Sequence, residues 1–148
     1  ELVLACDMIV VSEGARFALT ETQIGTLPYL VTVERLLRRV AENIATEMLY
    51  TGRRMSAAEM RDAGLANHVV PQDALRASAH RLAADIAESA PRSIATVRQA
   101  ISLFTNGTSD PNARAALERD FAAVMASEDA KEGAAAYTEK RKPQWRGR

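Results

Sequence analysis

The sequence predicts a protein of the α/β class, with short strands before residue 72 and helices after it. The apolar, β-branched run Asp7–Val11 is followed by Ser-Glu-Gly, a pattern typical of a short buried strand. Apolar residues at helical spacing recur through the second half of the chain. Aromatic residues make up only 5% of the sequence and alanine is frequent, which also favours helices.

The segment before the first predicted helix combines short extended pieces with turns. Residues Leu2–Cys6 either continue the strand or end a helix, because a short apolar run has no decisive period. Residues Arg16–Ala18 are expected to form a second extended piece. Gly25–Pro28 is expected to be a turn, since a proline disfavours helical backbone at the residue before it. A helical pattern begins at about Val31.

Local signals predict two helices between residues 42 and 64. Residues Glu42–Thr51 have a helical pattern that ends at Gly52. Ser56 and Glu59 have the spacing of a capping box, in which each side chain binds the other residue's backbone N–H. A short helix is therefore expected to begin at Ser56 and to end near Gly64.

One short strand and four helices are predicted for the remainder. Asn67–Pro71 is expected to be a strand closed by its proline, and the change to helices falls between Val70 and Asp73. The expected helix starts are Asp73, Pro91, Asp110–Pro111 and Ser127, with a loop at Asn106–Ser109. The apolar stripes of the first two helices are Leu75, Ala79, Leu82 and Ile86, and then Ile94, Val97, Ile101 and Phe104.

Composition and charge argue against several classes of function. Nineteen basic and nineteen acidic residues cancel, which argues against general nucleic-acid binding. No apolar stretch approaches the ~20 residues of a membrane span, so no membrane partner is expected. The single cysteine, Cys6, excludes an internal disulfide, suits a reducing, cytoplasmic location and is expected to be buried. Two isolated histidines, His68 and His80, do not make a metal site.

Two glutamates in a recurring context carry the functional signal. Glu1 begins an apolar run that ends at Asp7, and Glu21 follows Phe17 and precedes Gly25 and Pro28. This joint pattern resembles the crotonase superfamily, which contains the enoyl-CoA hydratases and isomerases. Outside that pattern, Glu1 would be interpreted as a solvated charge and Glu21 as an ion-pair partner.

The resemblance implies an enzyme that acts on acyl-CoA thioesters, most simply an enoyl-CoA hydratase of fatty acid metabolism. In such enzymes Glu21 would hold the attacking water as base, and Glu1 would orient the water and deliver the α-proton. No cofactor is implied, because coenzyme A enters as part of the substrate. The family's oxyanion-hole donors lie before the position of Glu1, so the sequence is expected to be part of a longer protein.

Two departures from the family pattern leave alternatives open. Thr20 stands where the family commonly has proline, and Tyr29–Thr32 replace a Gly-Ala-Gly-Gly segment. The replacement fills space beside the acyl group and stiffens the turn, although Tyr29 keeps its backbone N–H. The alternatives are an enoyl-CoA isomerase, another acyl-CoA enzyme of the superfamily, or a noncatalytic binding subunit with the same fold.

The resemblance extends through the whole chain. It implies the C-terminal part of a crotonase-like ββα-spiral core at residues 1–71, followed by a helical region at 72–148 for assembly and CoA contact. Homotrimers or hexamers are expected. The substrate-binding candidates are Gly25, Pro28, Tyr29, Tyr137 and Lys140. The last two would contact the nucleotide of CoA, and the alternative for them is a solvated basic tail.

Overall fold

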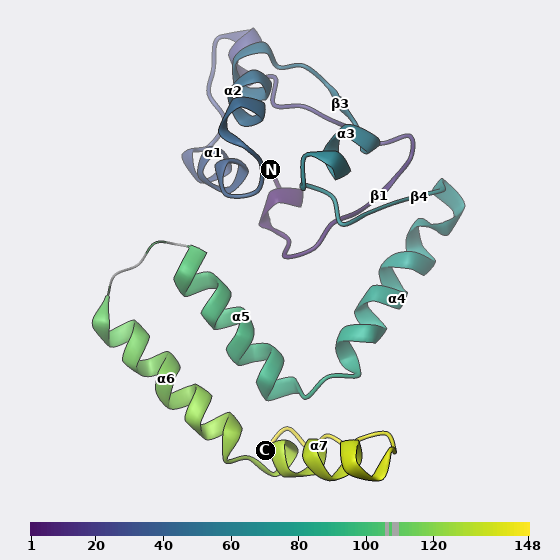
Figure 1. Cartoon of the computed structure of the whole chain (residues 1–148). Helices are drawn as coiled ribbons and strands as arrows, with labels where there is room; N and C mark the ends of the chain where they lie inside the picture. Colours follow the sequence, from purple (N-terminus) through teal and green to yellow (C-terminus); the bar gives the residue numbers. More distant parts are fainter. Residues whose placement is uncertain (106, 108–109) are drawn as a thin grey trace. The chain divides into compact units, whose positions relative to one another are not determined.

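The computed structural model describes residues 1–105, 107 and 110–148, and it divides into two compact units, Glu1–Arg81 and Leu82–Arg148. Figure 1 labels the helices and strands, and α4, Leu75–Ala87, contains the boundary between the units. The division of the chain into domains after residue 71 stays a prediction. Most of the loop expected at Asn106–Ser109 lies outside the described residues.

Two pairs of short strands organise the first unit. Strands β1, Val10–Ser12, and β4, His68–Val70, pair in parallel, with Val11 opposite Val69. Strands β2, Arg16–Phe17, and β3, Met55–Ser56, pair antiparallel. The structure therefore confirms extended segments in the three predicted places, although β1 begins at Val10 and includes Ser12, whereas Asp7–Val11 was predicted. It adds β3, which was not predicted. Figure 1 shows β1 and β4 side by side.

Helical turns connect these strands. The open question at Leu2–Cys6 is answered by a 3-10 helix, η1, at Val3–Ala5. The turn after β2 contains a second 3-10 helix, η2, at Glu21–Ile24, and α1 follows at Leu30–Leu37. Helix α2 spans Glu42–Thr51 as predicted.

Glycine and a capping box set the next boundaries. Gly52 ends α2 in the left-handed conformation, with φ of 61°. Helix α3, Ala57–Asp62, begins with the predicted capping box: Ser56 Oγ accepts from Glu59 N at 3.2 Å, and Ser56 N donates to Glu59 Oε2 at 2.7 Å. These bonds from Ser56, with an ion pair to Arg53, lower the pKa of Glu59 to about 2.

The core of the first unit is built from apolar side chains of η1, β1, α1, α2, β3 and α3 and of the segments between them. Its buried members are Leu4, Ile9, Val11, Leu19, Leu36, Val40, Ala45, Met48, Met55, Ala57, Met60, Leu65 and Ala66. Two predictions here were wrong. Cys6 is exposed, because it follows η1 and its thiol turns back toward the Leu2 carbonyl. Asp73 does not cap α4, because it lies inside a 3-10 turn, η3, at Gln72–Ala74.

The second unit contains three further helices, and each begins where the sequence predicted. Helix α5 spans Pro91–Thr105, α6 spans Pro111–Met125 and α7 spans Glu128–Glu139. Asp110 and Ser127 act as the N-caps of α6 and α7, through bonds to backbone N–H groups two and three residues on. The predicted stripe on α5, Ile94, Val97, Ile101 and Phe104, is 39% to 64% exposed.

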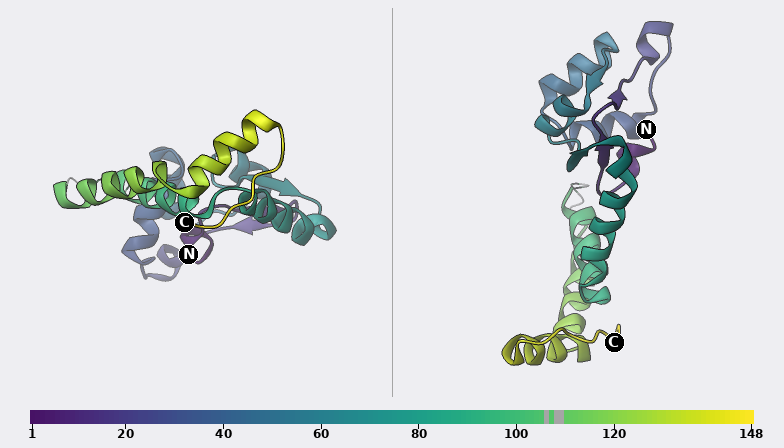
Figure 2. Two further views of the ribbon diagram at one scale, coloured as in Figure 1. Left: turned by 90° about the horizontal axis from the view of Figure 1, so that it is seen from below. Right: turned by 90° about the vertical axis from the view of Figure 1, so that its right-hand side faces the viewer.

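The C-terminal tail, residues 141–148, folds back along α7. Figure 2 shows the tail beside this helix in both views. Its backbone N–H groups at Gln144 and Arg146 donate to Glu132 and Asp129 on the first turns of α7. The tail therefore runs antiparallel to the helix and is part of the unit's structure.

Candidate active site

The carboxylate of Glu1 is held by two donors from the start of α1. Tyr29 N donates to Glu1 Oε1 at 3.2 Å, and Thr32 Oγ1 donates to the same oxygen at 2.8 Å. Thr32 is buried on the inner face of α1. The Thr32 bond, followed by the Tyr29 bond, lowers the pKa of Glu1 from its ordinary value of 4.5. Glu1 is therefore ionised at neutral pH with one oxygen fixed in place.

A small cavity adjoins this carboxylate. Its volume is about 30 Å³. Glu1, the segment Phe17–Leu19 and Leu65 line it, together with apolar side chains of η1, α1 and α2. A cavity needs roughly 10–15 Å³ to hold a water molecule, so there is room for one. Glu1 supplies a charged hydrogen-bond acceptor to a space that is otherwise mostly apolar.

Glu21 lies on η2, four positions after Phe17. Its Oε2 is buried and has no hydrogen-bond partner among the described residues. Residues Phe17–Leu19 line the cavity beside Glu1, and the chain continues from them into η2, which begins at Glu21. In the described residues, this segment connects the cavity to the second glutamate. The convergence of the two carboxylates over a substrate stays a prediction.

Two side chains of η2 tie Glu21's segment to the end of α2. Thr22 Oγ1 donates to the Leu49 carbonyl at 2.9 Å, and Gln23 Nε2 donates to the Thr51 carbonyl at 2.6 Å. These carbonyls belong to the last turn of α2, where intrahelical partners are missing. The side chains of Thr22 and Gln23, which follow Glu21, therefore anchor its segment to the last turn of α2.

The remaining predicted residues of this unit shape the turn between η2 and α1. Gly25 ends η2 with φ of 76°, a left-handed conformation that favours glycine, and its N–H donates to the Glu21 carbonyl. Pro28 is buried, and Tyr29 exposes 74% of its surface. The structure therefore brings Tyr29 directly to Glu1, and Gly25 directly to the backbone of Glu21.

The two C-terminal candidates lie in the second unit. Tyr137 is on the last turn of α7 and is 87% exposed. Lys140 follows as the C-cap of that helix, with φ of 53° and ψ of 40°. Its N–H donates to the Tyr137 carbonyl at 3.3 Å, so the two residues are neighbours in space.

Sequence reasoning missed Thr32 as a site residue. It is the one aliphatic hydroxyl in the segment that replaces the family's glycines, and it lies three positions after Tyr29, on the same side of a helix start. Its position inside an otherwise apolar stretch was the available signal. Elsewhere in the described residues, no group of three or more His, Cys, Asp or Glu side chains could hold a metal ion. Among the described helices, none has the length and apolar character that crossing a bilayer requires.

Comparison with known proteins identifies the family. The model of the enoyl-CoA hydratase/isomerase family matches residues 1–148. The chain belongs to this family. The match confirms the resemblance to the crotonase superfamily and covers both units of the structure.

Curated members of the enoyl-CoA hydratase/isomerase family give the level of similarity. Carnitinyl-CoA dehydratases from Proteus mirabilis (strain HI4320) and Salmonella typhi are 43% and 40% identical to this chain over 151 residues. Each match covers 100% of this chain and 58% of the relative. The chain therefore spans somewhat more than half the length of these family members.

Solved structures of family members confirm the crotonase-like fold. A crystal structure of enoyl-CoA hydratase from Mycobacterium tuberculosis H37Rv has a TM-score of 0.91 at 30% identity, and covers 99% of this chain and 58% of that one. An enoyl-CoA hydratase/isomerase from Mycobacterium paratuberculosis has a TM-score of 0.87 at 32% identity, with 99% and 58% covered.

Proposed function

We propose that the whole protein interconverts 3-hydroxyacyl-CoA and 2-enoyl-CoA thioesters by removing or adding water. The observation that carries the proposal is the Glu1 carboxylate, fixed by Tyr29 N–H and Thr32 beside a cavity with room for one water. Membership of the enoyl-CoA hydratase/isomerase family and the similarity to carnitinyl-CoA dehydratases support it.

In the direction of dehydration, Glu1 accepts the proton from the α-carbon of the thioester. Its lowered pKa keeps it in the ionised form that this step needs. Glu21 donates a proton to the β-hydroxyl group, which leaves as water while the C–H electron pair forms the new double bond. Hydration is the reverse: Glu21 takes a proton from the attacking water, and Glu1 returns one to the α-carbon.

The thioester oxygen gains negative charge in the transition state and needs backbone donors. In the family these donors precede the position of Glu1, and the chain covers 58% of its carnitinyl-CoA dehydratase relatives. We propose that the whole protein supplies donors of this kind. The chemistry needs acid–base groups and an oxyanion hole, and we propose that no cofactor takes part. Coenzyme A enters as part of the substrate.

We further propose that the acyl group is polar beyond its β-carbon, as the carnitinyl group is. Tyr29–Thr32 stand where small glycines would leave space for an acyl chain, and Tyr29, whose backbone N–H donates to the carboxylate of Glu1, exposes 74% of its surface. An exposed aromatic face suits a quaternary ammonium group. The similarity to dehydratases named for carnitinyl-CoA supports this choice.

The proposal also includes assembly into homotrimers or hexamers. The exposed apolar stripe of α5, together with Phe121 and Met125 on α6, would be unfavourable in contact with water over a large area. We propose that copies of the protein cover it. Tyr137 and Lys140 would then contact the nucleotide part of CoA.

The test is turnover of carnitinyl-CoA and of a straight-chain 2-enoyl-CoA by the full protein. Glu1→Gln and Glu21→Gln are each expected to lower kcat by about 10²- to 10⁴-fold, the usual contribution of a general acid or base. Glu13→Gln, at an exposed glutamate near β1, is the matched control and should be unaffected. Unchanged turnover in both site variants would contradict the assignment.

The products separate the alternatives. Hydration in ¹⁸O-labelled water places the label in the product, whereas double-bond isomerisation does not. An isomerase would therefore give a shifted double bond and no label. Protein that binds acyl-CoA but turns over none of these substrates would support the noncatalytic alternative.

A further inference from the structure

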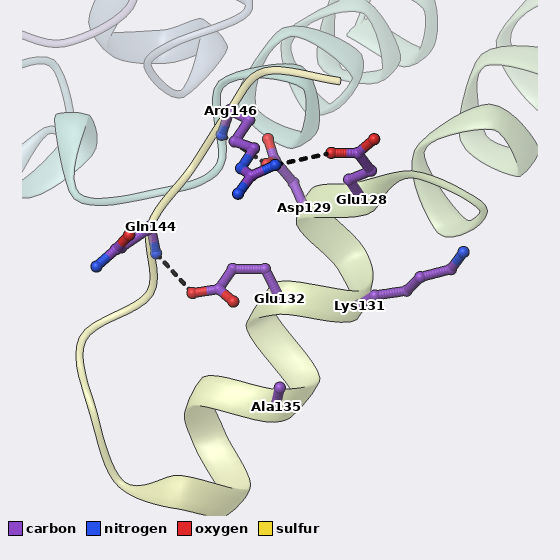
Figure 3. A pocket seen from close by; sticks show the side chains of 7 residues that line it. All are labelled: Glu128, Asp129, Lys131, Glu132, Ala135, Gln144 and Arg146. Carbon is purple, nitrogen blue, oxygen red and sulfur yellow. Dashed lines mark hydrogen bonds and ion pairs between the residues drawn. The ribbon is translucent and has the colours of Figure 1, made fainter.

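Glu132 on α7 binds the C-terminal tail at two places. Its carboxylate accepts two parallel bonds from the guanidinium of Arg141, at 2.6 and 3.0 Å. Oε1 also accepts from the backbone N–H of Gln144 at 2.8 Å, as Figure 3 shows. Arg141 is the first residue after Lys140, so this fork fixes the chain directly beyond the helix end.

Asp129 and Trp145 hold the tail further along. Asp129 is only 3% exposed and accepts from the backbone N–H groups of Arg146 and Gly147, at 2.7 and 2.9 Å. Trp145 Nε1 donates to the Glu88 carbonyl at 2.7 Å, and its ring packs so closely on Gly133 that a Cβ there would lie 3.3 Å from it. Together, Glu132, Asp129 and Trp145 form a clamp that the tail cannot leave without exposing paired groups.

Lys140 has an unusual backbone conformation at the point where the clamp begins. In the described residues, it is the only non-glycine residue with a positive φ. Its own N–H and that of Arg141 close the helix end by donating to the carbonyls of Tyr137 and Ala136. A side chain with a Cβ disfavours this conformation by a factor of about 5 to 30, so something must hold it there.

The charges of the tail also single out Lys140. Arg141, Lys142, Arg146 and Arg148 each form an ion pair with a glutamate of the same unit. Lys140, directly before the tail, has no carboxylate partner among the described residues. Its neighbour Tyr137 is almost completely exposed. A cationic residue whose backbone N–H binds the carbonyl of an exposed aromatic residue suits an external ligand that has both phosphates and a flat base.

We infer that Glu132 and Asp129 are positioning residues, which clamp the tail so that Lys140 keeps its left-handed conformation and presents its ammonium group, beside Tyr137, to the nucleotide part of CoA. The inference rests on the proposed function, which assigns an acyl-CoA substrate. It adds that affinity for the nucleotide depends on carboxylates that do not touch it. A glycine at position 140 would relieve the backbone but would lose the cation.

The experiment compares two substrates of the full protein, a 2-enoyl-CoA and the same acyl group on pantetheine, which lacks the nucleotide. Glu132→Gln is expected to raise KM for the CoA thioester by about 5-fold or more, with kcat unchanged and with kcat/KM for the pantetheine thioester unchanged. Glu139→Gln is the matched control, because Glu139 also pairs with Arg141 but binds no backbone group of the tail. Asp129→Asn tests the clamp independently if Glu132→Gln fails to fold.

Lys140→Gly separates the cation from the conformation. This variant should lose the same preference for CoA while its Tm stays equal or rises. Equal effects of Glu132→Gln on both thioesters, or no effect on either, would overturn the inference and leave only a structural clamp. Calorimetric titration with free CoA and with pantetheine measures the preference for the nucleotide without turnover, as the ratio of the two dissociation constants. If the protein shows no turnover but Glu132→Gln still lowers its preference for CoA, the proposed activity is refuted and the inference stands. If the protein binds no CoA, the proposed activity and the inference are both refuted.

Discussion

Replacing Gly52 by alanine should loosen the segment that carries Glu21. A Cβ at Gly52 would lie 2.7 Å from Cδ of Gln23, and φ at this position is +61°. The left-handed conformation costs a residue with a Cβ about 1–2 kcal/mol. Moving Gln23 aside breaks its 2.6 Å bond to the Thr51 carbonyl, a loss of about 0.5–1.5 kcal/mol. The expected total is about 1.5–3.5 kcal/mol.

Gly25→Ala is the matched control for this prediction. Gly25 has φ of +76°, but a Cβ there would meet nothing within 4 Å. It therefore carries the backbone cost alone, and the gain from a stiffer unfolded chain is the same in both variants. The difference between the two, about 1 kcal/mol, measures the contact with Gln23. Adding Gln23→Ala to both variants should abolish that difference.

The assay is urea unfolding of the full protein followed by circular dichroism, at one protein concentration because assembly would make stability depend on it. The turnover rate is measured on the same samples, since η2 positions Glu21. Equal unfolding free energies for Gly52→Ala and Gly25→Ala would refute the reasoning. So would a difference that persists when Gln23 is absent.

Three further predictions concern the core, the site and the dependence on pH. Leu36→Ala should lower the free energy of unfolding in urea by about 2–5 kcal/mol because Leu36 is 0% exposed. Its control, Leu37→Ala, should lower it by under about 1 kcal/mol because Leu37 is 45% exposed. Equal losses of stability would contradict the observed packing. Thr32→Val removes the main donor to Glu1, so the pKa of Glu1 should rise toward 4.5 and the acid limb of kcat/KM should move to higher pH; an unmoved limb would show that another group sets it. The capping-box bonds hold the pKa of Glu59 at about 2, against 4.5 ordinarily, so its stabilisation is complete above pH 4.5 and is lost as pH falls toward 2. Glu59→Gln should flatten that part of the stability curve, and an unchanged curve would argue against the assignment.

Elements with local signals could be predicted from the sequence. Ser127, Ser56 and the pair Asp110–Pro111 begin helices because their side chains or ring act on backbone groups within three residues. Gly52 ends α2 for the same local reason. Strand β3 is two residues long and has no period to recognise, so its pairing with β2 could not be inferred.

Features that depend on distant partners were missed or misjudged. Exposure of Cys6 follows from how η1 packs and not from its apolar neighbours. The two glutamates were recognised through the family pattern, but the bond from Thr32 to Glu1 joins residues 31 positions apart. The contact between Trp145 and the Glu88 carbonyl spans 57 positions. No spacing rule connects residues at such separations, because only the folded chain brings them together.

The parallel pairing of β1 with β4 has a consequence for the order of folding. Ile9 and Asn67, at the start of this pair, are 58 positions apart and bind through the Ile9 N–H and the Asn67 side chain. Closing a loop of that length costs roughly 3–4 kcal/mol of chain entropy before the short ladder forms. Helices α1 to α3 rely on nearer contacts, so we expect them to form first and β4 to dock late. Substitutions in His68–Val70 should then accelerate unfolding and leave the refolding rate almost unchanged, as stopped-flow kinetics would reveal.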